Sequence, residues 1–417
     1  MEHMTDTVGE NWARSYTYGA TALLAPTSVD ELREVVASAP LVRALGSRHS
    51  FTGIADSAGV LVRTDRLPAV IEVDAARSVA RVSGGLRYGD VATELQRQGW
   101  ALHNLASLPH ISVAGAVATG THGSGDRNGT LAAAVAALEI VTADGSLITL
   151  RRGDADFDGA VVSLGALGVV TTLELDIQPT FDVRQDLYLE LPWTALLDEF
   201  DAITSSAYSV SVFTSWQGET AEMAWLKSRM DAAAPPLDLF GAAREPESRH
   251  MLEGQDVVNT TQQGGVPGPW SDRLAHFKLE FTPSNGDELQ SEYLVPRARA
   301  REAIEAVRAL RDAVSPLLLV TEIRTMATDA LWLSGAYETD AVGIHFTWKK
   351  LPDEVGAVLP AIEAALLPLG ARPHWGKVFE RIEPANYPRL GDFRALRARM
   401  DPELKFDNAF LRRHLAG

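Results

Sequence analysis

The sequence of 417 residues contains no cysteine. Disulfide bonds, thiolate nucleophiles, zinc–thiolate centres and iron–sulfur clusters are therefore excluded. No run approaches the roughly 18 consecutive apolar residues that a membrane span requires. The N-terminus also lacks a basic patch followed by an apolar stretch, so we expect a protein without a signal peptide that stays in the cytoplasm.

Basic residues are scarce, because 38 Lys and Arg stand against 55 Asp and Glu and the net charge is −17. Nucleic acid binding depends on basic contacts to phosphate and is disfavoured. The same charge repels anionic substrates at long range, so a neutral small molecule fits best. The ten histidines show no H-E-x-x-H or comparable spacing, and we predict no metal site. Nothing resembles a self-complementary apolar patch, and a monomer is expected.

The first 180 residues alternate helix and strand signals. Ser28 is placed to cap a helix whose Glu31 completes a capping box. Two β-hairpins are predicted within residues 69–83 and 138–150, where alternating segments flank short polar turns.

The pattern changes after residue 179. Strands are predicted at 317–325 and 341–348, and helices at 296–313 and 354–367. Residues 232–265 are rich in Pro, Ala, Gly and polar side chains and indicate a surface loop. Strands and helices in this order are typical of an antiparallel sheet covered on one face, an α+β arrangement.

Residues 105–125 consist mostly of Gly, Ala, Ser and Thr. Small side chains let backbone N–H groups approach a pyrophosphate closely, but neither familiar phosphate-binding glycine signature is present. Composition alone leaves nucleotide binding and tight structural packing as equal alternatives. A second small-residue turn, 46–50, directly follows a predicted strand at 41–45, a junction that commonly carries function. By itself, His49 is more typical of a hydrogen-bonding loop histidine than of a reactive one.

Alternation within the later strands creates two polar pairs. Glu322 and Arg324 share one face of their strand, and His345 and Thr347 share one face of theirs. Such pairs suit a polyhydroxylated ligand, whose hydroxyls each need a partner once they leave water. The alternative is the solvated outer face of a half-buried sheet.

Seven blocks of sequence together resemble the vanillyl-alcohol-oxidase superfamily of flavoproteins, and within it the alditol (xylitol/sorbitol) oxidases. They occur in family order over essentially the whole chain, at residues 45–51, 106–112, 163–170, 322–325, 345–348, 372–377 and 401–410. The resemblance implies an FAD-binding domain at 1–180, a substrate domain at 181–375, and a C-terminal segment at 376–417 that returns to the FAD domain.

The resemblance also implies that FAD is attached covalently through His49. Relatives with a second link use a cysteine near the position of Ser107, so a single tether is expected here. Arg48 departs from the small residue expected before the histidine, and it would either reach the pyrophosphate or crowd the loop. The implied FAD contacts are Gly46, Ser47, Arg48, His49, Ser50, Ser107, Ser112, Gly115, Thr119, Gly120, Thr121, His122, Gly168, Val170 and His374.

The implied reaction moves a hydride from the terminal carbinol carbon of an alditol to flavin N5. Arg324 and Lys377 are the cationic candidates for stabilising the developing alkoxide. Glu322 and His345 would orient hydroxyls or accept a proton, and Ser107 and Thr347 would add hydrogen bonds. Reoxidation by O2 would give hydrogen peroxide, and the small Ala106 favours access of oxygen.

Two alternatives remain at this point. A sugar-1,4-lactone oxidase or dehydrogenase of the same superfamily would carry similar polar pairs. A non-catalytic flavin-binding protein would have little use for converging Arg, Lys, Glu and His side chains. The sequences of residues 107–110 and 372–377 favour the alditol oxidases over the lactone enzymes.

Overall fold

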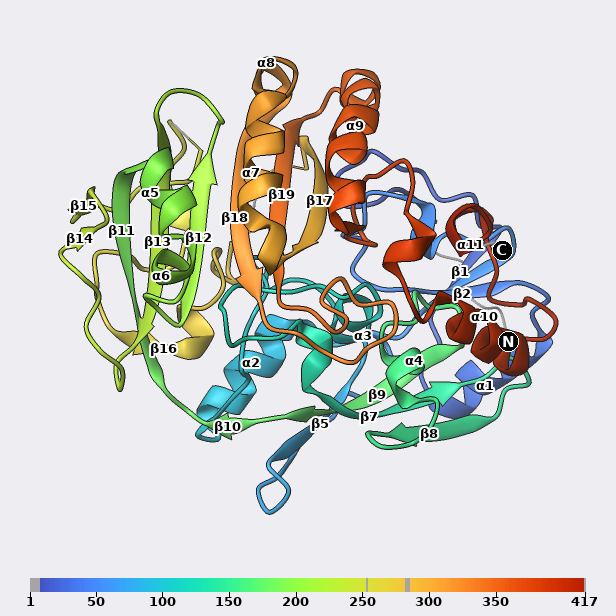
Figure 1. Cartoon of the computed structure of the whole chain (residues 1–417). Coiled ribbons are helices and arrows are strands. Elements are labelled where there is room, and N and C mark those ends of the chain that lie inside the picture. Colours follow the sequence, from blue (N-terminus) through green and yellow to red (C-terminus); the bar gives the residue numbers. More distant parts are fainter. Residues whose placement is uncertain (1–7, 253, 282–285, 416–417) are drawn as a thin grey trace.

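The computed structural model describes residues 8–415, apart from residue 253 and residues 282–285. Within this part of the chain, no helix combines the length and the apolar character needed to cross a bilayer. The chain forms two large β-structures that meet along one side (Figure 1).

The first β-structure uses residues 22–176 and contains two sheets. A three-stranded parallel sheet has the order β1-β3-β2, and a five-stranded antiparallel sheet has the order β4-β5-β9-β7-β8. Both predicted hairpins are present, as β4–β5 and β7–β8. The strands are β1 (Ala22–Leu24), β2 (Val42–Leu45), β3 (Val60–Arg63), β4 (Ile71–Asp74), β5 (Val79–Ser83), β7 (Val135–Val141), β8 (Leu147–Arg151) and β9 (Val169–Asp176).

Helix α1 (Val29–Ser38) begins where the sequence predicts. The Glu31 N–H donates to the Ser28 hydroxyl over 3.1 Å, and the Glu31 carboxylate accepts the Thr27 N–H over 2.7 Å. The carboxylate thus reaches one residue further back than the usual capping box, and it still satisfies a free donor at the helix start. The other helices of this part are α2 (Tyr88–Arg97), α3 (Val113–Ala118) and α4 (Phe157–Val161).

The second β-structure is one ten-stranded antiparallel sheet with the order β14-β15-β11-β13-β12-β18-β19-β17-β20, and β16 pairs with β11. Its strands are β11 (Asp182–Pro192), β12 (Ser209–Thr214), β13 (Thr220–Arg229), β14 (Asp238–Leu239), β15 (Ala242–Glu245), β16 (Gly268–Pro269), β17 (Glu288–Pro296), β18 (Leu318–Met326), β19 (Ala341–Lys349) and β20 (Arg372–Pro373). The short strands β6 (Trp100–Ala101) and β10 (Gln178–Pro179) pair separately, at the junction before this sheet.

Helices cover one face of this sheet, as the α+β prediction requires (Figure 1). They are α5 (Trp193–Asp198), α6 (Phe200–Thr204), α7 (Ala300–Ala309), α8 (Arg311–Val314) and α9 (Pro352–Leu366). The predicted helix at 296–313 is therefore divided into a 3₁₀ turn, α7 and α8.

Residues 232–265 are more ordered than the predicted surface loop, because β14 and β15 extend the sheet there. Arg244 of β15 forms an ion pair with the fully buried Asp186 of β11, which also pairs with Arg184 over 2.8 Å. This charge pairing fixes the segment to the sheet edge, and composition alone does not reveal it.

The C-terminal part packs against the first β-structure through α10 (Leu390–Met400) and α11 (Ala409–Leu415) (Figure 1). Asn408 is 6% exposed, and its amide donates to the carbonyls of Gly53, Ile54 and Asp56 over 2.9–3.1 Å. Its side-chain oxygen accepts the Leu411 N–H over 2.9 Å. One amide thus joins the start of α11 to the loop after β2.

Replacing Asn408 by alanine should lower the free energy of unfolding by about 2 kcal/mol, because buried carbonyls lose their donor. Urea unfolding followed by fluorescence measures the change. The exposed Gln217→Ala serves as the control and should shift stability by less than about 0.5 kcal/mol. Equal midpoints for the two variants would contradict this role of Asn408.

Candidate active site

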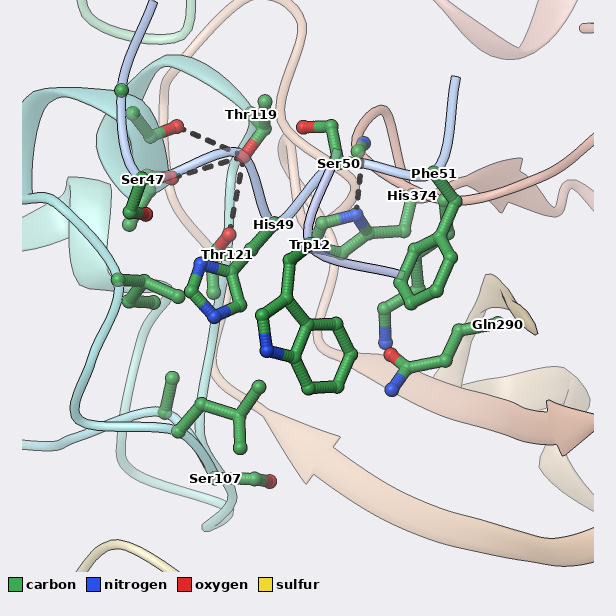
Figure 2. A pocket seen from close by; sticks show the side chains of 18 of the residues that line it. Trp12, Ser47, His49, Ser50, Phe51, Ser107, Thr119, Thr121, Gln290 and His374 are labelled. Atoms are coloured by element: carbon green, nitrogen blue, oxygen red, sulfur yellow. Dashed lines mark hydrogen bonds between the residues drawn. The ribbon is translucent and has the colours of Figure 1, made fainter. Parts of the chain in front are cut away.

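A cavity of about 320 Å³ lies where the two β-structures meet. Segments 43–51, 106–122 and 163–170 line it from the first structure, and side chains of β17, β18 and β19 line it from the second. Figure 2 shows His49, Thr119 and Thr121 on one side of this space, and Gln290 and His374 on another. All residues named from the sequence as cofactor or substrate contacts line the cavity except Gly120.

Hydrogen bonds join the two small-residue segments, residues 46–50 and 105–125. The Ser47 hydroxyl accepts the Ser112 N–H over 3.0 Å, and the Ser47 N–H donates to the Ser112 hydroxyl over 3.3 Å. A Cβ at Gly46 would lie 2.4 Å from the Ser112 Oγ and would displace this hydroxyl. The loop after β2 and the start of α3 therefore form one wall made of backbone and hydroxyl groups.

The rest of this wall comes from the end of α3 and the start of β9. The Thr119 hydroxyl lies 3.1 Å from both the Gly115 carbonyl and the Thr121 hydroxyl (Figure 2). Gly120 has a φ of 66°, which turns the chain at the end of α3, so its role is the turn and not a cavity surface. Gly168 and Val170 line the cavity beside this turn, and Ser50 lines it next to His49.

His49 lies against the indole of Trp12, with ring centroids 5.3 Å apart (Figure 2). Its Nδ1 is buried, and among the described residues it has no hydrogen-bond partner. Burial lowers the pKa of His49 to about 4, so the ring is neutral at physiological pH. A neutral imidazole with a free ring nitrogen can act as a nucleophile.

The guanidinium of Arg48 binds the N-terminal segment. Its guanidinium donates to the carbonyls of Val8 and Glu10 over 2.5 and 3.2 Å, and it lies over the Tyr18 ring at 5.6 Å. The backbone has a φ of 63°, a left-handed conformation that is uncommon for arginine. Arg48 borders the cavity, and its cation also binds the N-terminal segment, so its expected contact with FAD stays a prediction.

The opposite wall carries the predicted polar pairs. Glu322 and Arg324 project from β18, and His345 and Thr347 project from the neighbouring β19. Arg324 donates to the Ser107 hydroxyl over 3.3 Å, which connects this wall to the first β-structure. All four residues are at most 8% exposed, so the solvated-face alternative is wrong.

Glu292 of β17 joins the cations and was not singled out from the sequence. Its two oxygens accept hydrogen bonds from Arg324 over 2.8 Å and from Lys377 over 2.6 Å. Burial alone would raise its pKa, but Lys377 and Arg324 hold the pKa of Glu292 well below its usual range. The signal was present, since Glu288, Gln290 and Glu292 alternate along the strand.

The four charged side chains grouped around Arg324 balance one another. Arg324 and Lys377 carry two positive charges, and Glu292 and Glu322 carry two negative ones. Burial lowers the pKa of Lys377, and Glu292 opposes that shift. A group of donors and acceptors whose charges pair with one another suits a neutral, hydroxyl-rich ligand.

His122, Glu292 and His374 place ligand atoms within 4.8 Å of one another, a spacing that resembles a metal site. However, Glu292 already accepts Arg324 and Lys377, and His374 Nδ1 accepts the Gly376 N–H over 3.1 Å. A further cation would face both existing ones at close range. We therefore interpret this group as part of the hydrogen-bonding network around Glu292.

Comparisons with known proteins agree with this geometry. The FAD binding domain family matches residues 20–151, and the D-arabinono-1,4-lactone oxidase family matches residues 285–414. The alditol oxidase of Streptomyces is 49% identical over 98% of this chain and 99% of its own length. The L-gulono-1,4-lactone dehydrogenase of Mycobacterium tuberculosis is 30% identical over 98% of this chain and 99% of its own length.

Among solved structures, cholesterol oxidase from B. sterolicum superposes with a TM-score of 0.78 at 14% identity, covering 98% of this chain and 96% of that one. The two proteins therefore share a fold, and the predicted vanillyl-alcohol-oxidase-type FAD-binding fold is confirmed. Near-complete coverage at 49% identity shows the family: the chain belongs to the alditol oxidase family of FAD-dependent oxidoreductases, within the vanillyl-alcohol-oxidase superfamily.

Proposed function

We propose that this enzyme oxidises the terminal primary hydroxyl of alditols such as xylitol and sorbitol to the aldose, with O2 as the final electron acceptor. The observation that carries the proposal is the convergence of Ser107, Glu322, Arg324, His345, Thr347 and Lys377 on one cavity that also contains the His49 loop. The 49% identity to the Streptomyces alditol oxidase supports the same substrate class.

The first wall fits FAD by its chemistry. Interlocked hydroxyls and small residues leave room and donors for a pyrophosphate, and the free nitrogen of His49 fits a covalent tether. When bound, FAD supplies the hydride acceptor, whose reoxidation by O2 yields hydrogen peroxide. The residues proposed to hold it are Gly46, Ser47, His49, Ser50, Ser107, Ser112, Gly115, Thr119, Thr121, His122, Gly168, Val170 and His374.

The second wall would hold the alditol. Arg324 and Lys377 direct positive charge at the reacting hydroxyl, where negative charge develops as the proton leaves. Glu292 holds both cations in place through hydrogen bonds of 2.8 and 2.6 Å. Glu322 and Thr347 would bind the neighbouring hydroxyls.

His345 is the base that these contacts favour. Its Nε2 lies 3.2 Å from the Gln290 side-chain oxygen, an acceptor, so Nε2 carries the ring proton and Nδ1 keeps a lone pair. Burial holds the pKa of His345 well below its usual range, and the ring is neutral. A neutral imidazole in this wall can accept the hydroxyl proton.

A sugar-1,4-lactone is the second candidate substrate. The lactone oxidase family model covers residues 285–414, which contain β17, β18, β19 and Lys377. The same donors and acceptors would bind a lactone ring, so the distinction needs a direct measurement.

Anaerobic mixing of the purified protein with xylitol should bleach the flavin absorbance, because the alcohol carbon gives up a hydride. Admitting air should restore the colour and release hydrogen peroxide, which a peroxidase-coupled assay measures. Bleaching by L-gulono-1,4-lactone but not by xylitol or sorbitol would show that the substrate is a lactone and not an alditol. A protein that no alcohol reduces would indicate a non-catalytic flavin carrier.

Acid precipitation should leave the yellow flavin attached to the protein pellet, because His49 would be bonded to it. His49→Ala should release all of its flavin into the supernatant under the same conditions. Arg33→Ala, at an exposed helix position that does not line the cavity, should retain the flavin like the parent. If the unmodified protein also released all of its flavin, FAD would not be covalently attached.

Lys377→Ala should bind FAD normally and lose turnover by about a hundredfold or more, the usual effect of removing a group that stabilises developing charge. Loss of one cation also leaves Glu292 with Arg324 as its main partner. Flavin absorbance measures cofactor content, and peroxide production measures turnover with xylitol. Unchanged turnover would exclude Lys377 from the mechanism.

A further inference from the structure

A buried lysine and a buried histidine are linked by hydrogen bonds to Glu322. Lys227 of β13 is 1% exposed and donates to the carbonyls of Leu274 and Ala275 over 2.6 and 2.8 Å. Its Nζ lies 3.3 Å from Nδ1 of His276, whose Nε2 lies 2.7 Å from the Glu322 carboxylate. An ammonium, an imidazole and a carboxylate thus form a line that ends at the cavity, which His276 and Glu322 both border.

The donors and acceptors in this line fix one protonation state. An ammonium has three N–H donors and no lone pair, and two of these donors go to carbonyls. The third faces His276 Nδ1, which must then be the acceptor. A neutral imidazole with a lone pair on Nδ1 carries its proton on Nε2, and Nε2 therefore donates to Glu322.

The surroundings keep His276 neutral. Its ring packs against Phe213 and Trp225, with centroids 5.9 and 5.2 Å away. The charged groups that act on it are Lys227 of β13 and Glu322 and Arg324 of β18. Burial lowers the pKa of His276 to about 4, and the two cations support this against the pull of Glu322.

Lys227 is charged in the pH range where it is needed. Burial lowers its pKa to about 7, so the ammonium is present below neutrality. That is the range in which an ordinary histidine, with a pKa of about 6.5, gains its second proton. On the other side of Glu322, His345 Nδ1 lies 4.0 Å from the second carboxylate oxygen.

We propose that Lys227 is a positioning residue, which holds His276 neutral with its proton on Nε2 so that Glu322 stays an oriented carboxylate that accepts an alditol hydroxyl. The inference rests on the proposed function, because it concerns how Glu322 binds that substrate. The backbone N–H of His276 donates to the Ser107 carbonyl over 3.1 Å. The segment that carries His276 therefore supports substrate contacts on both walls.

The test compares Lys227→Met with Lys405→Met across pH. Lys405 is also buried and donates to two carbonyls, of Val36 and Ala37, but it does not border the cavity. The two variants lose the same kind of buried ammonium. Both are loaded with FAD, and kcat and KM for xylitol are measured from pH 5 to 8.

Without the ammonium, the pKa of His276 should rise, because repulsion is lost while Glu322 still favours the imidazolium. As pH falls, His276 would become charged and neutralise Glu322, which weakens its bond to the substrate hydroxyl. In Lys227→Met, kcat/KM should therefore fall towards acid pH, by up to about tenfold once His276 is charged, which is the ratio between a charge-assisted and a neutral hydrogen bond. The loss should appear in KM more than in kcat, and neither the parent enzyme nor Lys405→Met should show it.

A double variant identifies the titrating group. Glutamine at position 276 can donate to Glu322 but does not titrate. In Lys227→Met/His276→Gln, kcat/KM should therefore no longer fall at acid pH. The inference would be overturned if kcat/KM of the double variant still fell at acid pH. It would also be overturned if kcat/KM of Lys227→Met changed with pH in the same way as that of the parent. Failure of the proposed function looks different, because the parent enzyme itself would then not be reduced by xylitol.

If Lys227→Met does not fold, two variants of His276 give the same answer. His276→Gln keeps a donor to Glu322 and His276→Leu removes it, while both keep the backbone bond to Ser107. The leucine variant should have a KM about tenfold above that of the glutamine variant. Equal KM values would overturn the inference.

Discussion

The site depends on the buried carboxylate of Glu292. Two cations, Arg324 and Lys377, come from chain segments more than fifty residues apart and both bind this one side chain. Without a counter-charge, two buried cations at close range would repel each other and would be costly to desolvate. Glu292 removes that cost, so the cations can be held at a fixed distance in a wall that water scarcely reaches.

This charge balance explains how an acidic protein can present cations to a substrate. Each cation is paired inside the wall, so the cavity gains directional donors without a net positive field. The pairing also gives each strand a distinct task. β17 supplies the counter-charge and β18 supplies Arg324 and Glu322, while β19 adds His345 and Thr347. The first β-structure joins this network through the bond from Arg324 to Ser107.

The two walls differ in how they are built. The first wall is made of backbone and small side chains, and its shape depends on glycine at positions such as Gly46, where any Cβ would collide with Ser112. The second wall is made of long charged side chains on a rigid sheet. A dinucleotide and a polyol need these two kinds of surface, since one presents phosphates and the other presents neutral hydroxyls.

The sequence by itself determined the parts that depend on local spacing. Alternation along β18 and β19 placed Glu322 with Arg324 and His345 with Thr347, because side chains two apart share a face of any strand. The short polar turns predicted both hairpins, and the Ser28 cap predicted the start of α1. Only the tertiary structure decided which segments meet. Strand alternation marks Glu292 as one of several polar side chains on a face, and nothing local marks His276 or Lys227, because the roles of all three arise from partners about 30 to 85 residues away. Arg48 likewise binds carbonyls of a segment that sequence spacing does not connect to it. Pairing across such separations follows from how the sheets pack against each other, and no periodicity within one strand encodes it.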